Sequence, residues 1–356
     1  IGNNIKNALT TNSRDIFAGA ITVVQPIYMG GATSAANEMA KISEKISSTT
    51  MEQTRQNTLY DIENAYWLVV QLSNKKNLAA DYAKLLKKLE GDVDKMIAEG
   101  VATKADGLKV RVAVNEADMT LMKVEDGVRL AKMRVCHKCG MSLDTEITLA
   151  DEAKDNNEFV APSYLLEDYT DTHDFSNRPE LQLLEHASAL SKQSTRLVRA
   201  LNRPQVLAKA AFTVTNPSIY NGFEKKFGAN WNVGVLARIP IWDWNDTEHK
   251  VNASKAVTTI TGLQMQEARE LIELQIEQNK FKLSEAKRKL TIAEKNIEKA
   301  EENMRCANLG FSEGVMTTTD VMAAQTAWMQ ARTQKIDAQI DIVLANLSLK
   351  KALGRM

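Results

Sequence analysis

Cysteine is scarce in this 356-residue chain, and long apolar runs are missing from it. Three cysteines are an odd number and too few for a disulfide framework. No uninterrupted apolar stretch reaches the roughly 18 residues that a membrane-spanning helix needs. Lysine plus arginine equals aspartate plus glutamate at 45 each, so the net charge is zero and gives no electrostatic reason to expect nucleic acid as a partner.

Catalytic and metal-binding patterns are also absent from the sequence. No arrangement of residues suggests a nucleophile together with a base and oxyanion donors. The three histidines His173, His186 and His249 are scattered and suggest no ligand set. We therefore predict that the protein is not an enzyme and binds neither a cofactor nor a metal.

The sequence does contain an internal repeat with an offset of 214 residues. The letters "PIY" at 26–28 match "PIW" at 240–242, and "GVATKAD" at 100–106 matches "GVMTTTD" at 314–320 without a gap. The offset holds from Phe17, which matches Trp231, as far as glycines 140 and 354. Such a series of matches predicts two copies of one structural unit.

Each copy is predicted to hold one strand followed by two helices. Segments 16–26 and 231–240 are short and rich in β-forming residues, and they end at Pro26 and Pro240, which suits the last position of a strand. These prolines are the predicted strand-to-helix junctions. Gly91 is the only glycine between residues 32 and 99, which contain no proline, and 245–309 is equally poor in both. About 67 residues of helix at ~1.5 Å each make a rod of roughly 100 Å.

The apolar spacing of these helices predicts coiled-coil packing, because apolar residues recur at steps of three and four. A short turn separates the long helix from the shorter one, so each copy is an antiparallel hairpin that reverses at Gly100 or Gly314. The seam positions are 62, 65, 69, 72, 76, 79, 83 and 86; 110, 114, 117, 121, 124, 128, 131 and 135; 283, 286, 290, 293, 297, 300 and 304; and 324, 328, 331, 335, 338, 342, 345 and 349. Lys76 and Lys335 interrupt the pattern.

A structural coiled-coil oligomer with no membrane role is the alternative, but such a rod has no use for the strands. The strands alternate as membrane barrels do. In 17–23, 205–215 and 231–237 one face is apolar and the other is polar or small. The partners of the third strand and of the helix from Asn177 would precede Ile1, which indicates that the numbering begins inside a longer gene product. Three or four strands cannot close a barrel, so several chains must share one.

The two copies, "NRPEL" at 177–181 and above all "GFSEGVMTTTDVMAAQTAWMQAR" with "LSLKKALGRM" closely resemble the TolC-type outer-membrane efflux family over essentially the whole chain. The resemblance implies a mainly helical fold with membrane β structure. Long antiparallel coiled-coil hairpins would form an α-barrel joined to a transmembrane β-barrel that a homotrimer shares. It implies a channel-tunnel in the bacterial outer membrane that extends into the periplasm and contacts outer-membrane lipid.

The resemblance also implies partners and a domain plan. The trimer would be the passive exit duct of a tripartite efflux or type I secretion system, docking to a periplasmic adaptor protein and an inner-membrane pump. Residues 1–140 would be the first strand-helix-helix repeat, 141–176 an acidic equatorial linker, and 177–356 the second repeat with its extra helix and strand. Residues 3–14 and 215–228 would be the extracellular loops.

Two sets of site residues follow from the same resemblance. The hairpin tips Gly100, Val101, Gly314 and Val315 would dock the adaptor, although "EGV" stands where a Val-Gly-Leu-like sequence is common. The pore constriction would be formed by Asp106, Phe311, Met316 and Asp320.

The constriction departs from the pattern of the family. A tyrosine, an arginine and one acidic ring of the family are missing, the last being replaced by Ala323. Both remaining aspartates, Asp106 and Asp320, are in the first turn of a helix, where capping and the helix dipole favour aspartate in any case. The gating and capping interpretations therefore stay open.

The segment "CHKCG" at 136–140 is the one stretch that resembles site chemistry. A zinc or redox site needs four ligands or a reactive thiol pair, and only Cys136, His137 and Cys139 cluster here. The repeat aligns this segment with a last helical turn closed by Gly354, so we favour a structural role over a metal or redox site. In an oxidising periplasm the two cysteines could form an intrahelical disulfide.

Overall fold

The computed structural model describes residues 16–152, 175, 177–218 and 226–356. The elements follow in the order β1 (Phe17–Met29), α2 (Ala32–Ala98), α3 (Lys104–Lys138), α4 (Pro179–Ala200), β2 (Gln205–Asn216), β3 (Gly228–Arg238), α5 (Asp246–Ser312) and α6 (Thr318–Ala352). None of the helices in the described ranges combines the length and the apolar character that crossing a bilayer requires.

The chain forms two compact units, and each unit is assembled from two separate stretches of sequence. The first unit contains residues 1–48 and 183–266, and the second contains 49–182 and 267–356. The long helices α2 and α5 begin in the first unit and end in the second. The division of the sequence at residues 140 and 176 follows the repeat instead and stays a prediction.

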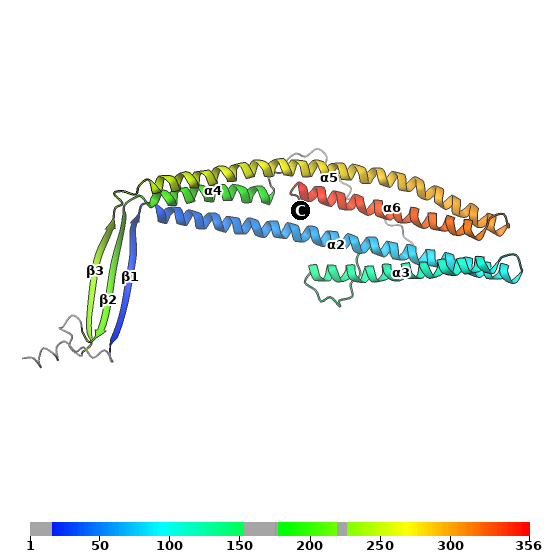
Figure 1. Ribbon diagram of the computed structural model, residues 1–356, viewed down its shortest axis with the longest axis horizontal. Helices are drawn as coiled ribbons and strands as arrows, with labels where there is room; N and C mark the ends of the chain where they lie inside the picture. Colours follow the sequence, from blue (N-terminus) through cyan, green and yellow to red (C-terminus); the bar gives the residue numbers. More distant parts are fainter. Residues whose placement is uncertain (1–15, 153–174, 176, 219–225) are drawn as a thin grey trace, which may run out of the picture. The chain divides into compact units, whose positions relative to one another are not determined.

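The first unit is built on a three-stranded antiparallel sheet with the order β1-β2-β3, so that β2 lies in the middle (Figure 1). Directly paired residues share one face of a sheet. The register therefore places the predicted apolar residues of all three strands on one face and the polar or small ones on the other. One apolar row is Ile21, Phe212 and Trp231, and the adjacent polar row is Thr22, Ala211 and Asn232.

The prediction that each strand ends at its proline is wrong. β1 continues past Pro26 to Met29, and its register shifts between Pro26 and Tyr28, so an irregularity of the bulge type accommodates the proline. β1 lies at the edge of the described sheet, where the missing N–H of proline need not break a ladder hydrogen bond. β3 ends at Arg238, two residues before Pro240.

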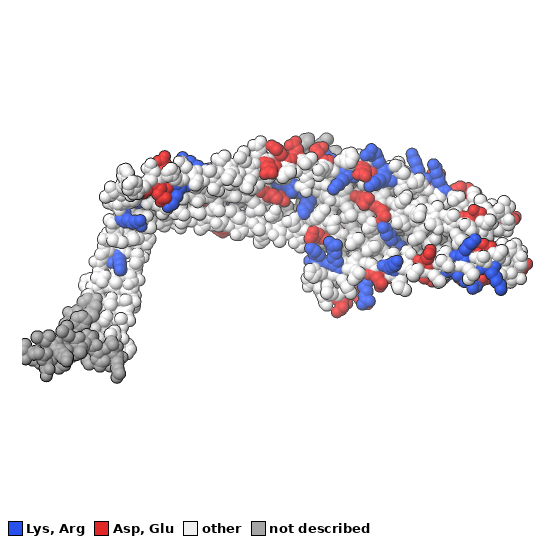
Figure 2. Space-filling view, viewed as in Figure 1, with Lys and Arg blue, Asp and Glu red and all other residues white. Residues whose placement is uncertain are grey.

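The predicted long helices are confirmed. α2 and α5 each contain 67 residues and α3 and α6 each contain 35, and the bounds of both pairs differ by 214 residues at each end. Uninterrupted helices of this length are possible because α2 contains one glycine, α5 contains two, and neither contains proline. On the visible face, charged side chains of both signs are distributed over the helices and are rare on the sheet (Figure 2).

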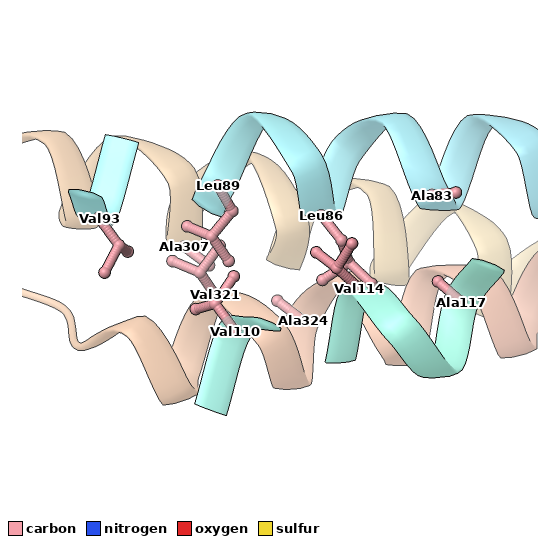
Figure 3. Close-up of a cluster of buried hydrophobic side chains, with 10 residues drawn as sticks. All are labelled: Ala83, Leu86, Leu89, Val93, Val110, Val114, Ala117, Ala307, Val321 and Ala324. Carbon is pink, nitrogen blue, oxygen red and sulfur yellow. The ribbon is translucent and has the colours of Figure 1, made fainter. Parts of the chain in front are cut away.

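The predicted seams form the core of the second unit, because every seam position is buried or half-buried. Figure 3 shows one cluster in which all four long helices meet. Its members are Ala83, Leu86, Leu89, Val93, Val110, Val114, Ala117, Ala307, Val321 and Ala324. The intruding lysine at position 76 is half-buried and pairs with Glu125 at 3.7 Å.

The linker contributes to the core where the structure describes it. Residues 141–152 contain no helix, as predicted. Ile147 and Leu149 pack against a cluster of buried α2 and α3 residues that includes Val69 and Val135. The expected loop 3–14, most of the rest of the linker, and residues 219–225 of the expected loop 215–228 lie outside the described residues.

Candidate functional site at the helical hairpin turns

The two hairpin turns share one backbone geometry. Gly100 and Gly314 have φ values of 78° and 73°, the left-handed region that a glycine enters without steric cost. The amide of the next residue bonds back into the preceding helix, from Val101 N to Met96 O and from Val315 N to Gly310 O, both at 2.8 Å. This bond closes the carboxyl end of a helix in a Schellman-type turn.

The valines of these turns are unusually open to solvent. In this type of turn the residue after the glycine often packs its apolar side chain back onto the helix. Val101 and Val315 instead remain 69% and 82% exposed. Two apolar side chains are thus presented at the ends of the hairpins, as the sequence predicted for the docking tips.

Each turn leads into a capping box. Thr103 and Thr317 are N-caps whose hydroxyl oxygens accept hydrogen bonds from the backbone N–H groups of Asp106 and Asp320. In return, the Asp320 carboxylate accepts bonds from the Thr317 backbone N at 2.9 Å and from its hydroxyl at 2.7 Å. The reciprocal bonds satisfy amides that a helix amino terminus leaves open.

The two aspartates differ in their charge environment. Side-chain and backbone hydrogen bonds from Thr317 lower the pKa of Asp320 below its usual value of 3.8. Hydrogen bonds from Thr103 and Lys109 lower the pKa of Asp106, and Lys109 Nζ lies 3.2 Å from its Oδ1. Among the described residues no cation pairs with Asp320. Asp320 therefore carries the less compensated negative charge of the two.

The other predicted constriction residues lie beside the same turn. Phe311 is half-buried and packs against the cluster shown in Figure 3, so part of its ring is core rather than surface. Met316 is more exposed, and its Cγ would lie 2.9 Å from a Cβ added at Gly310. The chain thus brings Phe311, Met316 and Asp320 to one turn, and their role in a pore stays a prediction.

Sequence reasoning missed an ion cluster across the first hairpin. Arg111 on α3 reaches back to α2, where its Nη2 lies 3.1 Å from Asp94 Oδ1 and its Nε lies 3.4 Å from Glu90 Oε1. At the offset of the repeat, glutamine takes the place of this arginine, so the ion cluster distinguishes the first turn from the second.

A second missed feature is the arginine of "NRPEL". Arg178 is buried and clamps three groups that are far apart in the sequence. Its guanidinium forks onto the Glu180 carboxylate with two bonds of 3.2 Å, and its Nη1 donates to Gln275 Oε1 at 3.0 Å and to the Ala352 carbonyl at 3.2 Å. The motif was visible in the sequence, but these partners were not.

The cysteine segment closes a helix, as expected. Cys136 is fully buried and its thiol lies 3.6 Å from the Thr145 carbonyl, while Cys139 is the exposed C-cap of α3. Gly140 and Gly354 have φ values of 70° and 69° at the matching helix ends. In the described ranges no three His, Cys, Asp or Glu residues are arranged to hold a metal ion.

Comparison with protein families identifies this arrangement of strands and hairpins. The sequence matches the outer membrane efflux protein family over residues 3–135 and 175–355. The chain belongs to this family. Its members are transport conduits of the outer membrane, so this efflux protein is an outer-membrane channel protein that extends into the periplasm.

Solved structures show the same fold for this efflux protein. The outer membrane protein VceC of Vibrio cholerae is 14% identical with a TM-score of 0.74, and the match covers 99% of this chain and 90% of VceC. The Campylobacter jejuni channel CmeC (13%, 0.73, covering 96% and 77%) and the open-state Neisseria gonorrhoeae channel MtrE (14%, 0.72, covering 98% and 81%) are also similar. Comparison with curated proteins gave no significant match.

Proposed function

We propose that three copies of this efflux protein form one channel-tunnel, the passive exit duct of a tripartite efflux or type I secretion system. The observation that carries the proposal is the incompleteness of the sheet. Almost every residue of β1 and β3 is exposed, and within the described residues each of these strands pairs along one edge only. A bilayer tolerates no open strand edge, and about eight strands are the minimum for a closed barrel. Several copies must therefore share one barrel.

The apolar face of the sheet has the height of a membrane. On β2 it extends from Asn216, the partner of Phe17, to Val206, the partner of Tyr28. Ten residue steps at ~3.3 Å make ~33 Å along the strand, or about 25 Å across a bilayer at a tilt near 40°. This height is that of the apolar band of outer-membrane barrels. The opposite face, polar or small, suits a water-filled lumen.

The helices also support an assembly of several copies. Exposed apolar side chains recur along α3 and α5, which a solitary helical hairpin in water would not favour. They are Leu108, Val112, Met119, Met122 and Leu130 on α3, and Val257, Ile260, Leu263, Leu271, Leu274, Phe281 and Ile292 on α5. Neighbouring copies would cover them in an α-barrel. The equal lengths and the constant offset of the helix pairs support a protomer built from two repeats of one unit.

The assembly can be tested on the complete protein. Crosslinking in detergent at micromolar concentration is expected to yield trimers, because the open strand edges and exposed helix faces need partners. Detection of monomers alone would refute the shared barrel. A protein that purifies from the soluble fraction without detergent would support the alternative, a structural coiled-coil oligomer with no membrane role.

The exposed tip valines support docking of a periplasmic adaptor, which in turn would connect the duct to an inner-membrane pump. Val101→Trp and Val315→Trp are expected to abolish export while trimers remain in the membrane. Val101→Thr and Val315→Thr, which keep the shape of the side chain, are the controls and should retain export. Export that survives the tryptophan variants would place docking elsewhere on the protein.

Asp320 is proposed to act as the charged ring of the constriction, with Phe311 and Met316 closing the pore by apolar packing. Three uncompensated carboxylates at a narrow point would favour cations. In single-channel recordings Asp320→Asn should reduce cation preference sharply without loss of trimers. Asp106→Asn is the matched control, because Lys109 already balances that carboxylate. Unchanged selectivity in the Asp320 variant would leave this aspartate as a helix cap.

A further inference from the structure

The chain enters its two long helices through the same backbone conformation. Gly30 and Gly31, the two residues before α2, have φ values of 63° and 95°. Trp244 and Asn245, the two residues before α5, have φ values of 53° and 62°. Both junctions are thus made by two consecutive residues with positive φ, but only the first junction uses glycine.

Glycine is required at the first junction for two reasons. Besides the positive φ, a Cβ at position 30 would lie 2.6 Å from Arg203 Cβ and 2.8 Å from the Ala200 carbonyl oxygen. At the second junction Asn245 tolerates the left-handed conformation, as asparagine often does, whereas the bulky Trp244 is strained there. A glycine would adopt this conformation with less strain.

The tryptophan ring gains little contact within its own chain in exchange for that strain. Trp244 is 84% exposed and Trp242 is 75% exposed. The two rings meet edge to face with centroids 5.7 Å apart, and the neighbouring Ile241 is more exposed than either. This exposed group of Trp242, Trp244 and Ile241 is called the tryptophan pair below. Its position indicates a contact outside the chain.

The tryptophan pair follows directly after the membrane-facing strand. Tyr28 lies at the helix end of the apolar face, in one row with Val206 and Ala237. The pair follows Ala237 in the sequence and precedes Asp246, where the charged helix α5 begins. It therefore stands between the apolar strand surface and the first charged turn, the place where tryptophan is enriched at membrane interfaces.

We propose that Trp242 and Trp244 anchor the protein in the phospholipid headgroup layer on the helix side of the outer membrane. This inference rests on the proposed membrane channel. The ring faces would lie against the upper acyl chains, and the indole N–H groups would donate to headgroup phosphate or ester oxygens. Lipid is the chosen partner because the pair continues the face that carries Val233 and Val235, which the channel proposal turns toward lipid.

Trp231 gives a depth marker in the same strand. It lies in the row of Phe212, six residues along β2 from the row of Tyr28. Six steps at ~3.3 Å and a tilt near 40° place it about 15 Å farther into the membrane than Tyr28. Trp328, half-buried on α6, is the control that should never reach lipid.

Fluorescence quenching by brominated phospholipids tests the proposal on the complete protein in vesicles. Three versions would keep a single tryptophan, Trp244, Trp231 or Trp328, with the others changed to phenylalanine. Bromine near the headgroup should quench Trp244 about twofold more than bromine near the acyl-chain ends, and Trp231 should show the opposite order. Trp328 should be quenched by neither lipid.

The outcomes separate this inference from the channel itself. Quenching of Trp231 without quenching of Trp244 would overturn the anchor and leave the channel intact. No quenching of Trp231 would refute the membrane sheet and the anchor together. If the single-tryptophan versions fail to assemble, Trp244→Phe in the otherwise unchanged protein replaces them. It should remove part of the quenching by the headgroup-brominated lipid, and an unchanged signal would contradict the anchor.

Discussion

Replacing Arg178 with methionine would open the clamp that joins α4, α5 and α6. Methionine keeps much of the apolar length of arginine but removes all four of its hydrogen bonds. The Glu180 carboxylate, the Gln275 side chain and the Ala352 carbonyl would then lose their shared donor. The variant therefore removes one partner of a buried network and leaves the others in place.

The magnitude follows from the burial of the two charges. The Arg178 side chain is 7% exposed and that of Glu180 is 34% exposed. Removing one member of a fully buried ion pair destabilises a protein by about 3–5 kcal/mol, and the partial hydration of Glu180 reduces this to about 2–4 kcal/mol. Arg178→Met should lower the free energy of unfolding by that amount.

The assay is guanidinium unfolding of the detergent-solubilised protein, followed by the helical circular dichroism signal. Arg305→Met is a matched control, because Arg305 also forks onto a glutamate, Glu302, but both side chains are about 60% exposed. Such a surface pair contributes little to stability. Its removal should leave the unfolding midpoint unchanged within error.

The pair can also be tested by a double variant and by pH. Arg178→Met with Glu180→Leu should be less damaging than the sum of the single changes, because no charge is left buried alone. Burial would raise the pKa of Glu180, but hydrogen bonds from Arg178 and from backbone prevail and hold it below its usual 4.5. Its stabilisation is therefore complete above pH 4.5 and is lost on acidification, and Arg178→Met should weaken this acid sensitivity. Equal losses for Arg178→Met and Arg305→Met would refute the reasoning.

Two further predictions concern the hairpins. Leu86→Ala, in the cluster of Figure 3, should lower the free energy of unfolding by about 2–5 kcal/mol because the side chain is fully buried. Leu108→Ala, at an exposed position of the same hairpin, should lower it by less than about 1 kcal/mol, and equal losses would contradict the described packing. The lowered pKa of Asp320 means that its cap is intact above pH 3.8 and fails on further acidification. Hydrogen exchange should then show the first turn of α6 opening below that pH, and Asp320→Asn should remove this pH dependence.

The sequence by itself determined the helical hairpins, because their signals are local. Proline and glycine are rare within the helices, glycines mark the reversals, and threonine with aspartate three residues later marks each helix start. The three- and four-residue spacing identified the buried seams, and strand alternation identified the two faces of the sheet. Each of these patterns depends on the geometry of a few adjacent residues.

Tertiary structure decided what depends on segments far apart in the chain. The sequence named three strands but not that β2 lies between the other two, nor that β1 continues past Pro26 through a change of register. It offered "NRPEL" as a motif, yet the partner of Arg178 at Ala352 lies 174 residues away. Such contacts form only when packing brings distant segments together, and no local propensity specifies them. The left-handed conformation of Trp244 runs against local preference, and its junction with α5 became visible only in the folded chain.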